Sequence, residues 1–582
     1  MMKRLMALTL CLFTLLSVFG CAKRDKLEGE EDKGAFINMY LGTEIYDFDP
    51  QLPVTNDSAV KVISMIYEPL FCVAENGKLE KALVKKVEIK ENDVKGEYQM
   101  ILTLNDTCWS DGTYVSANNV VYSWKRILEP DFTSPACALL FDVKNARAIK
   151  EGDASIDDLG VAAIDELVIE ITFEGKIDYD QFMLNLASYA LVPLREDIVS
   201  RSADWSKKPA TTVCSGPFML RRVTYGEGLI LERNSYYFRD TDKEDGDVLN
   251  KSVNPYRIVI DFTKSTADQV TDFTTDLLFY NNEIALDQRA AYAETAQITD
   301  LASTHAYFFN MSNPLFEKAE VRRALSMALD REAIAKAVVF AKPATGVVPY
   351  AVFNGKTADS LFREVGGSLI TTTADIAGAK SLLASAGVNG GEFTLTHRAD
   401  EVDRAVAEMA KAAWEQLGFT VTLVELSSEK PASEVEAIKD DAFNKVFAAR
   451  NFDVIAIDAS TLTADAYSIL APFAKLFSGQ GMDMTTGEYL ASPHITGYDS
   501  EAYNAKMEEV YAEKDIEARA ALLHEAEKIL VEDMPIIPVY FNQDAAIIHD
   551  DLTGIKSFWG GLRDFRMAKL ADYGRFTTAV TE

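Results

Sequence analysis

The chain has 582 residues, of which 48% are hydrophobic and 25% charged, with only 17 prolines. This composition is that of a globular protein with a large core, so it excludes a disordered chain, a collagen and a small disulfide scaffold. Its 58 basic and 90 acidic residues leave a formal net charge of −32. Such a charge repels nucleic-acid phosphates and anionic lipid headgroups. We therefore expect no nucleic-acid partner.

Residues 1–20 have the pattern of a signal peptide, because Lys3 and Arg4 precede a short, largely apolar stretch. The stretch is shorter than the ~18 apolar residues of a transmembrane helix, and a polar segment follows it at once. Its end, Val18-Phe19-Gly20-Cys21, resembles a bacterial lipobox, which implies that Cys21 becomes the lipidated mature N-terminus. Residues 21–35 are then a lipidated tether that is too rich in charge to be buried.

Four cysteines remain once Cys11 leaves with the signal peptide and Cys21 takes the lipid. An exported chain can pair these cysteines as disulfides. Four cysteines in so long a chain do not make a disulfide framework, however, so buried thiols are the expected state. The five histidines show no metal-ligand spacing, and we expect neither a metal nor a cofactor. The four cysteines are Cys72, Cys108, Cys137 and Cys214.

Runs rich in β-branched and aromatic residues alternate with helical periodicities along the whole chain. The runs at 98–104, 167–173 and 256–260 are typical of strands. Apolar residues on one helical face predict a helix at 321–329, and Asp330 can cap a second helix directly after it. The alternation predicts a mixed α/β fold.

Two further helices are expected near the C-terminus. Ser500 can cap a helix that runs to about residue 512. An apolar stripe from Leu522 to Leu530 predicts the next helix, which Pro535 stops. We expect these stripes to pack into the core rather than to bind a ligand.

The sequence contains no convincing catalytic motif. Residues 354–357 end like a phosphate-binding P-loop, but the first glycine of that motif is missing. Ser427 and Lys430 have the S-x-x-K spacing of serine acyl-transfer enzymes, a pattern that recurs by chance in long chains. We therefore expect a binding protein rather than an enzyme.

Five stretches in order along the chain resemble one known family. They are Asp49-Pro50 with residues 67–71; residues 108–126; residues 215–218 with 231–234; Asn310 with Phe316, 321–325 and 329–331; and 526–530 with 534–540. With the lipoprotein signal before them, they resemble the extracytoplasmic solute-binding proteins of peptide-type ABC transporters, called family 5. Within the second stretch, residues 110–113 are suited to a tight turn and Ser116 to a helix cap, so we expect these motif residues to be structural.

The resemblance implies a fold and a division of the chain into lobes and a small domain. The fold is the α/β, periplasmic-binding-protein-like flytrap (type II, cluster C), which has two lobes and an extra small domain. The expected division assigns 36–62, 186–305 and 536–582 to the first lobe, 63–185 to the small domain packed on it, and 306–535 to the second lobe. A solute would be buried between the lobes, and the closed form would be recognised by the membrane permease that works with an ATPase.

Three positions depart from the peptide-binding pattern of the family. Val54, followed by Thr55 and Asn56, stands where the pattern has an acidic cleft residue. Ala136 stands where it has an aromatic residue that contacts the ligand. Leu462 stands where an aspartate would hold the amino terminus of a peptide, and a buried ammonium without a carboxylate costs several kcal/mol.

Other residues are candidates for the cleft by their place in the family pattern. Asp458 and Asp465 flank Leu462, and either can replace the missing aspartate if the loop is shifted. Arg398 and Asp403 follow a strand whose loop carries ligand contacts in the family. Tyr307 and Asn310 lie on the strand that enters the second lobe.

The leading interpretation is a monomeric receptor, anchored to the bilayer through Cys21, that delivers a peptide or peptide-like solute to an ABC permease. Within the same fold, a non-peptide solute such as an oligosaccharide or a metal chelate is the alternative. A secreted hydrolase and a surface chaperone or adhesin stay open as more remote readings.

Overall fold

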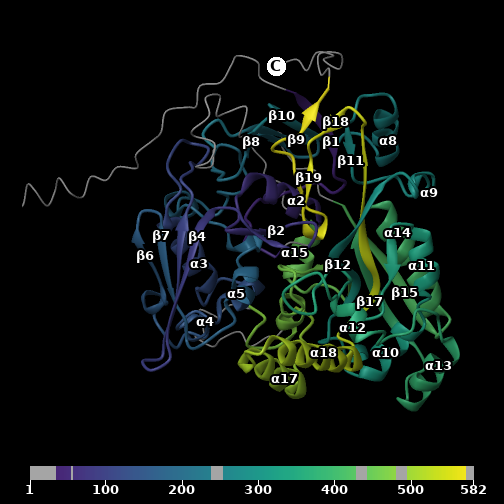
Figure 1. Cartoon of the computed structure of the whole chain (residues 1–582). Coiled ribbons are helices and arrows are strands. Elements are labelled where there is room, and N and C mark those ends of the chain that lie inside the picture. Colours follow the sequence, from purple (N-terminus) through teal and green to yellow (C-terminus); the bar gives the residue numbers. More distant parts are fainter. Residues whose placement is uncertain (1–34, 54–56, 238–252, 428–441, 480–494, 572–582) are drawn as a thin grey trace, which may run out of the picture.

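The computed structural model describes residues 35–53, 57–237, 253–427, 442–479 and 495–571. It is a mixed α/β protein with two lobes, as the resemblance implies. In Figure 1 the sheet that contains β1, β9 and β10 forms the upper part, helices α10 to α14 lie at the right below it, and the sheet with β4, β6 and β7 lies at the left.

One large sheet passes through both lobes. Its strand order is β15-β14-β16-β12-β17-β11-β1-β10-β9-β8, and β13 also pairs with β17. The long strands β12 (Gln297–Phe309) and β17 (Ile536–Ile548) run antiparallel in its middle. The other strands are β1 Phe36–Tyr40, β8 Phe218–Thr224, β9 Gly228–Arg233, β10 Arg257–Asp261, β11 Tyr280–Asn281, β13 Ala341–Pro343, β14 Gly391–Arg398, β15 Phe419–Leu426 and β16 Val454–Ser460.

The pairing of β12 and β17 joins the two halves of the molecule. The end of β17 pairs with β11, next to β1 and β10, while β12 pairs on its other side with β16. Nine consecutive residues of β12, from 301 to 309, are buried, because both faces of the strand are covered. The two strands therefore carry the chain from one half to the other as a pair.

A separate four-stranded sheet forms the left part of the molecule (Figure 1). Its order is β4-β5-β7-β6, all antiparallel, with β4 Val84–Asn92, β5 Glu97–Leu104, β6 Val161–Asp165 and β7 Val168–Thr172. Helices α3 (Ala117–Leu128), α4 (Ala146–Lys150) and α5 (Tyr179–Asn185) accompany it. The predicted strands at 98–104, 167–173 and 256–260 are confirmed by β5, β7 and β10.

The predicted helices are confirmed with their caps. Asp330 accepts a hydrogen bond from the Ala333 amide at the start of α11, and Ser500 caps α17. Helix α18 ends directly before Met534, whose φ is 50°, and Pro535 follows. The helices of this half are α10 Ala319–Met327, α11 Arg331–Val338, α12 Phe362–Gly366, α13 Ile376–Ser385, α14 Glu401–Glu415, α15 Ala442–Ala448, α16 Tyr467–Leu470, α17 Glu501–Ala512 and α18 Ile516–Asp533.

The upper half carries α2 (Asp57–Ile66), α6 (Glu196–Val199), α8 (Thr266–Thr274) and α9 (Arg289–Tyr292). Helix α2 has a buried apolar face that includes Val62, Ile63 and Ile66. Its first residue, Asp57, follows the gap at 54–56 in the described chain.

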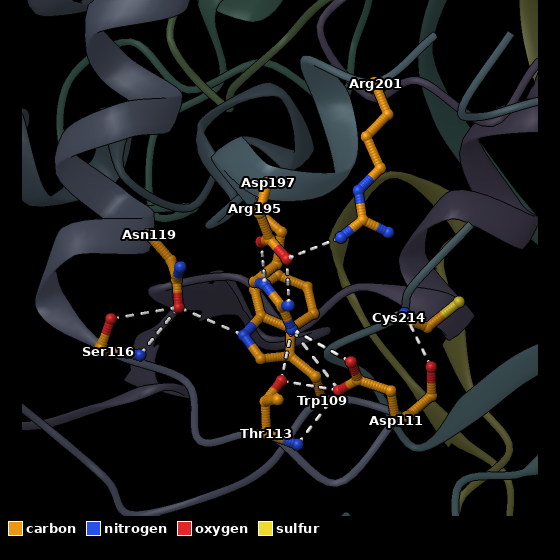
Figure 2. Close-up of polar contacts among 10 residues, drawn as sticks. Trp109, Asp111, Thr113, Ser116, Asn119, Arg195, Asp197, Arg201 and Cys214 are labelled. Carbon is orange, nitrogen blue, oxygen red and sulfur yellow. Dashed lines mark hydrogen bonds and ion pairs between the residues drawn. The ribbon is translucent and has the colours of Figure 1, made fainter. Parts of the chain in front are cut away.

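The turn around Trp109 is structural, as expected (Figure 2). The Asp111 carboxylate accepts hydrogen bonds from the Thr113 amide at 3.0 Å and the Thr113 hydroxyl at 2.6 Å. Gly112 has a φ of 83°, which the tight reversal requires and which a glycine adopts without strain. The Asn119 side chain accepts from the Ser116 amide at 2.9 Å and from the Trp109 indole at 3.1 Å, so one residue ties the turn to the start of α3. These contacts explain the motif without a ligand.

The four cysteines Cys72, Cys108, Cys137 and Cys214 are thiols, three of them buried. Burial raises the pKa of Cys137 to about 11 and of Cys214 to about 12, which keeps both protonated and unreactive. In the part of the chain that the structure describes, no helix is both long and apolar enough to cross a membrane.

Candidate functional site

Two neighbouring cavities lie between the halves of the large sheet. The first, here the apolar cavity, has about 1300 Å³ of empty space, counting the part open to solvent. Helix α2, the end of β16 with the loop after it, and residues 558–566 contribute to its wall. Side chains that line it include Val60, Ile63, Tyr237, Leu462, Phe558 and Trp559. The wall is therefore mostly aliphatic and aromatic.

The second cavity, here the acidic cavity, has about 1960 Å³ of empty space on the same count. Residues 40–46 and the start of α2 line one side, and the start of α14 lines the other. Its carboxylates outnumber its basic side chains. The acids are Glu44, Asp57, Glu283, Asp400, Glu401, Asp403, Asp458 and Asp544, and the bases are Lys61, Arg289, Arg398 and Arg404.

Asp57 lines both cavities and reaches across the cleft. Its carboxylate accepts hydrogen bonds from Ser460 at the end of β16, at 3.2 Å, and from Ser303 of β12, at 3.4 Å. Burial and, after it, the neighbouring Asp458 carboxylate raise the pKa of Asp57 to about 6. Asp57 is thus a carboxyl from α2 that is held against strands of the opposite half.

Asp458 forms the other end of a short polar chain. His305 contacts its Oδ1 through Nδ1 at 2.9 Å, and the Asn542 amide donates to the same oxygen at 3.1 Å. Asn542 also donates to the Ser303 hydroxyl at 2.8 Å, which connects the chain to Asp57. Although burial acts to raise the pKa of Asp458, the hydrogen bond and charge of His305 hold it below the usual value.

Asp403 lies on the first turn of α14, opposite Asp458. Its Oδ1 is 4.0 Å from His305 Nδ1, and its Oδ2 accepts from the Arg398 amide at 3.3 Å. Burial and the Asp458 carboxylate raise the pKa of Asp403 to about 7, although Arg398 acts to lower it. Asp400 caps α14, and burial followed by the charge of Asp403 raises its pKa well above the usual value.

Other carboxylates of the acidic cavity are neutralised by the protein. Asp544, whose side chain is fully buried, lies 2.7 Å from Lys61 Nζ and 3.1 Å from Arg563 Nη2. Burial would raise its pKa, but Lys61 and Arg563 together hold the pKa of Asp544 below its usual value. Glu283 forms an ion pair with Arg289. The six other acids of the cavity are Glu44, Asp57, Asp400, Glu401, Asp403 and Asp458, against the two other bases Arg398 and Arg404.

The structure brings some of the predicted site residues to the cleft. Arg398, Asp403 and Asp458 line the acidic cavity, and Leu462 lines the apolar cavity. Tyr307 is fully buried beside them, with its ring 5.9 Å from the His305 ring.

Other predicted residues lie elsewhere. Asn310 donates to the carbonyls of Arg450 and Phe452, so its side chain joins two loop segments. Ala136 is buried in a 3-10 turn, Pro135–Leu140, that does not contribute to either cavity wall.

Asp465 lines neither cavity. It accepts from Arg519 at 2.7 Å and from the Gln181 amide at 3.0 Å, so its charge is already compensated. Cys21 and the three positions Val54, Thr55 and Asn56 lie outside the described residues, as does Lys430 of the S-x-x-K pattern.

Sequence reasoning missed Asp57, Lys61 and Asp544 as cleft residues. Counting from Asp49-Pro50 placed the cleft residue of the family pattern at Val54, three residues before Asp57. The signal that could have identified Asp57 is its position as the acidic first residue of an amphipathic helix. Tyr540 ends the motif stretch 534–540 and Asp544 follows it, but that stretch served only to identify the family.

Contacts across the cleft hold the small four-stranded part against the helical half. Arg147 of α4 pairs with Glu508 of α17 at 2.5 Å, and Lys514 pairs with Asp142 at 2.9 Å. The Tyr511 hydroxyl donates to the Phe141 carbonyl at 2.8 Å. The cleft is thus closed on this side by direct protein contacts.

The site shows no arrangement for metal binding. Within the described ranges, no group of three or more His, Cys, Asp and Glu side chains is placed to hold a metal ion. The acidic cavity instead offers separate carboxylates from opposite walls, which suits a larger organic cation.

Residues 88–480 match the family described as bacterial extracellular solute-binding proteins, family 5 Middle. The dipeptide-binding protein DppE of Bacillus subtilis is 25% identical over 97% of this chain and 99% of its own length. Among solved structures, the substrate-binding domain of an oligopeptide ABC transporter from Bacillus anthracis has a TM-score of 0.77 at 20% identity, covering 94% of this chain and 100% of that one.

Two solved structures of MppA also match this chain. The Escherichia coli murein tripeptide binding protein MppA has a TM-score of 0.75 at 22% identity, and the match covers 94% of this chain and 99% of that one. A structure of MppA in an unliganded open form reaches only 0.55, with the same identity and coverage. This chain shares its fold with both structures.

Proposed function

The chain belongs to family 5 of the bacterial extracellular solute-binding proteins, and on that basis we propose that it captures a peptide or peptide-like solute and delivers it to an ABC permease. Members of the family bind solutes, so the chain is a binding protein and not an enzyme. Peptide-binding relatives such as DppE support the peptide class.

The observation that carries the proposal is the pair of cavities between the two halves. Side chains from both halves line the apolar cavity, among them Val60 of α2 and Leu462 after β16, and this cavity opens to solvent. Walls from both halves allow a bound solute to stabilise the closed state over the open one. A short peptide fits this space, with its side chains in one or both cavities.

The division expected from the resemblance is part of the proposal. Residues 36–62, 186–305 and 536–582 form the first lobe, 63–185 the small domain and 306–535 the second lobe. The paired strands β12 and β17 support a hinge at the boundaries near 305 and 536. In this proposal, the receptor is a monomer and the permease recognises its closed form.

Mass spectrometry of small molecules released by denaturing the purified protein tests the proposed function. We expect a set of short peptides, because closed clefts retain ligand through purification. A single non-peptide compound would contradict the peptide class while leaving the receptor role in place. Release of nothing, together with no binding of any peptide in a titration, would contradict both.

A non-peptide solute is the second candidate, and one observation favours it. Leu462 stands where the family pattern has the aspartate for a peptide amine, and in this structure it lines the apolar cavity. Thr461, beside it, has a buried hydroxyl with no partner among the described residues. An apolar solute with a hydroxyl or carbonyl group would satisfy both features.

Membrane anchoring through Cys21 is proposed from the lipobox resemblance. Replacing Cys21 with Ser removes the thiol that takes the lipid, so the variant should leave the membrane fraction and appear in the soluble fraction. Fractionation and immunoblotting measure this, with Cys72→Ser as the control that should stay with the membrane. Full retention of Cys21→Ser would instead indicate an uncleaved N-terminal anchor.

A further inference from the structure

A third cavity, here the seam cavity, lies where the small four-stranded part meets the helical half. It has about 500 Å³ of empty space, counting the part open to solvent. The 3-10 turn Pro135–Leu140 and α5 contribute to one wall, and α16 with the start of α18 contributes to the other. The seam cavity shares no lining residue with the apolar cavity or the acidic cavity. It is therefore a space separate from both.

Two amide side chains of α5 line the seam cavity. Gln181 and Asn185 lie four residues apart, on one face of the helix, and are only 8% and 6% exposed. The Gln181 nitrogen donates to Asp465 Oδ2 at 3.0 Å, and the Asn185 nitrogen donates to the Leu139 carbonyl at 3.2 Å. Because a carboxylate and a carbonyl only accept, these bonds fix which atom of each amide is the oxygen. Both oxygens, Gln181 Oε1 and Asn185 Oδ1, are buried and have no hydrogen-bond partner among the described residues.

A third unpartnered atom comes from the opposite wall. Tyr467 of α16 lines the seam cavity and is 4% exposed, and its hydroxyl has no hydrogen-bond partner within the described ranges. Burial raises the pKa of Tyr467 well above its usual value, so the hydroxyl keeps its proton and can donate it in a hydrogen bond. Unsatisfied buried polar groups are rare in proteins. Three of them in the walls of one cavity indicate a missing partner.

The charged side chains around the seam cavity are already compensated by the protein. Three ion pairs surround it, and the remaining acid of its wall, Glu513, accepts a hydrogen bond from the Asp515 amide at 2.8 Å. The pairs are Lys514 with Asp142, Lys356 with Asp178 and Arg519 with Asp465. We therefore expect a neutral occupant.

The three unpartnered atoms restrict the chemistry of this occupant. The two amide oxygens need hydrogen-bond donors, while the Tyr467 hydroxyl needs an acceptor. An ammonium or guanidinium group has no acceptor, and a carboxylate has no donor. A diol or a carboxamide carries two donors and an acceptor in one neutral group, so either of these groups satisfies all three atoms.

We propose that the seam cavity binds a small neutral ligand through a diol or a carboxamide group, which donates to Gln181 and Asn185 and accepts from Tyr467. The inference goes beyond the proposed function, because this cavity is separate from those that would hold the solute. The ligand contacts side chains of both parts. It should therefore stabilise the same contact that Arg147 and Glu508 make between the small four-stranded part and the helical half.

Four small probes separate these chemistries. Glycerol carries a diol and acetamide a carboxamide, while sodium acetate offers an acceptor alone and ammonium chloride donors alone. Thermal unfolding of the purified protein is followed at increasing concentrations of each probe, in the wild type and in Tyr467→Phe. The variant loses only the unpartnered hydroxyl, so general solvent effects of a probe are shared by both proteins and cancel in the comparison.

Glycerol or acetamide should raise the melting temperature of the wild type more than that of Tyr467→Phe. The apparent affinity for the probe should fall about two- to tenfold in the variant, as expected for the loss of one hydrogen bond. A response to glycerol assigns the cavity to a diol, and a response to acetamide assigns it to a carboxamide. Equal shifts in both proteins with every probe, or a response to acetate or ammonium alone, would overturn the inference.

Tyr503→Phe is the matched control. Tyr503 is also fully buried in the helical half, but its hydroxyl donates to the Leu470 carbonyl at 2.7 Å. Without a probe, Tyr503→Phe should lower the melting temperature, because it removes a satisfied hydrogen bond, whereas Tyr467→Phe should not lower it. Tyr503→Phe should respond to the probes as the wild type does. An equal loss of stability in the two variants would show that an ordered water already serves the Tyr467 hydroxyl, which would overturn the inference.

Discussion

The affinity for acetyl-Ala-Phe-Arg, a peptide whose only positive group is a guanidinium, is expected to rise about tenfold or more between pH 5.5 and pH 8. Burial and, after it, the Asp458 carboxylate raise the pKa of Asp57 to about 6 and of Asp403 to about 7. Below these values the carboxyl groups are protonated and must lose a proton before they can bind a cation. The guanidinium does not titrate in this range, so the change belongs to the protein.

The stability of the ligand-free protein should change with pH in the opposite direction to the ligand affinity. A carboxyl group whose pKa is raised on folding binds its proton more tightly in the folded state than in the unfolded chain. Its stabilising contribution is present at low pH and is lost as the pH rises through the folded pKa, here about 6 to 7. Ligand affinity and ligand-free stability should therefore change in opposite directions over this range.

Calorimetric titration across pH measures the effect. Acetyl-Ala-Phe-citrulline, in which citrulline keeps the shape of arginine without its charge, serves as the control with a flat profile. Asp403→Asn should remove the upper part of the rise. A flat profile for the arginine peptide would show that these carboxyl groups do not contact the cation. The other titratable and charged groups that face Asp57 and Asp403 include Asp400, Asp458, Asp544, His305, Tyr189, Tyr307, Tyr540, Lys61 and Arg398.

Glu527→Ala is expected to destabilise the fold by about 3–5 kcal/mol, because it leaves a buried arginine without its partner. Arg363 of α12 and Glu527 of α18 form an ion pair in which both side chains are fully buried. Glu527 also accepts hydrogen bonds from the amides of Val347 and Val348, each at 2.8 Å. The substitution therefore removes the charge and the one oxygen that accepts both of these hydrogen bonds.

Urea unfolding measures the free energy of unfolding of this variant. Glu525→Ala, two residues earlier on the same helix, is the control, because Glu525 is exposed and its ion pair with Lys506 is worth at most about 1 kcal/mol. Equal losses in the two variants would contradict a structural role for the buried pair. Glu527→Gln should lie between them, since its amide oxygen can still accept from both backbone amides while the charge that pairs with Arg363 is lost.

Local features of the fold were predictable from the sequence because they depend on neighbouring residues. The cap at Asp330, the cap at Ser500 and the end of α18 before Pro535 all follow from local hydrogen bonds and backbone limits. The turn at 110–113 follows from Asp and Gly at suitable positions. The ordered series of motifs in turn identified the family, and with it the two-lobed fold.

The candidate site was predictable only in part. Asp403 and Asp458 were found because the family pattern places ligand contacts near them. Asp465 looked equivalent to Asp458 in sequence, yet Arg519, more than fifty residues later, compensates its charge. Asp57 was missed because counting from Asp49-Pro50 without a gap places the cleft residue at Val54. No local signal in the sequence shows that the start of α2 lies against β16.

Several secondary-structure elements, the family and the lack of a recognisable catalytic motif follow from the amino-acid sequence alone. Which aspartates share a cavity depends on the three-dimensional fold, because strand pairing and the approach of the two lobes bring their charges together from distant parts of the chain. The register that pairs His305 with Asp458 and the hydrogen bonds that join Asp57 to Ser303 and Ser460 are long-range contacts. Their electrostatic consequences depend on burial and distance, which a linear pattern of charges does not contain.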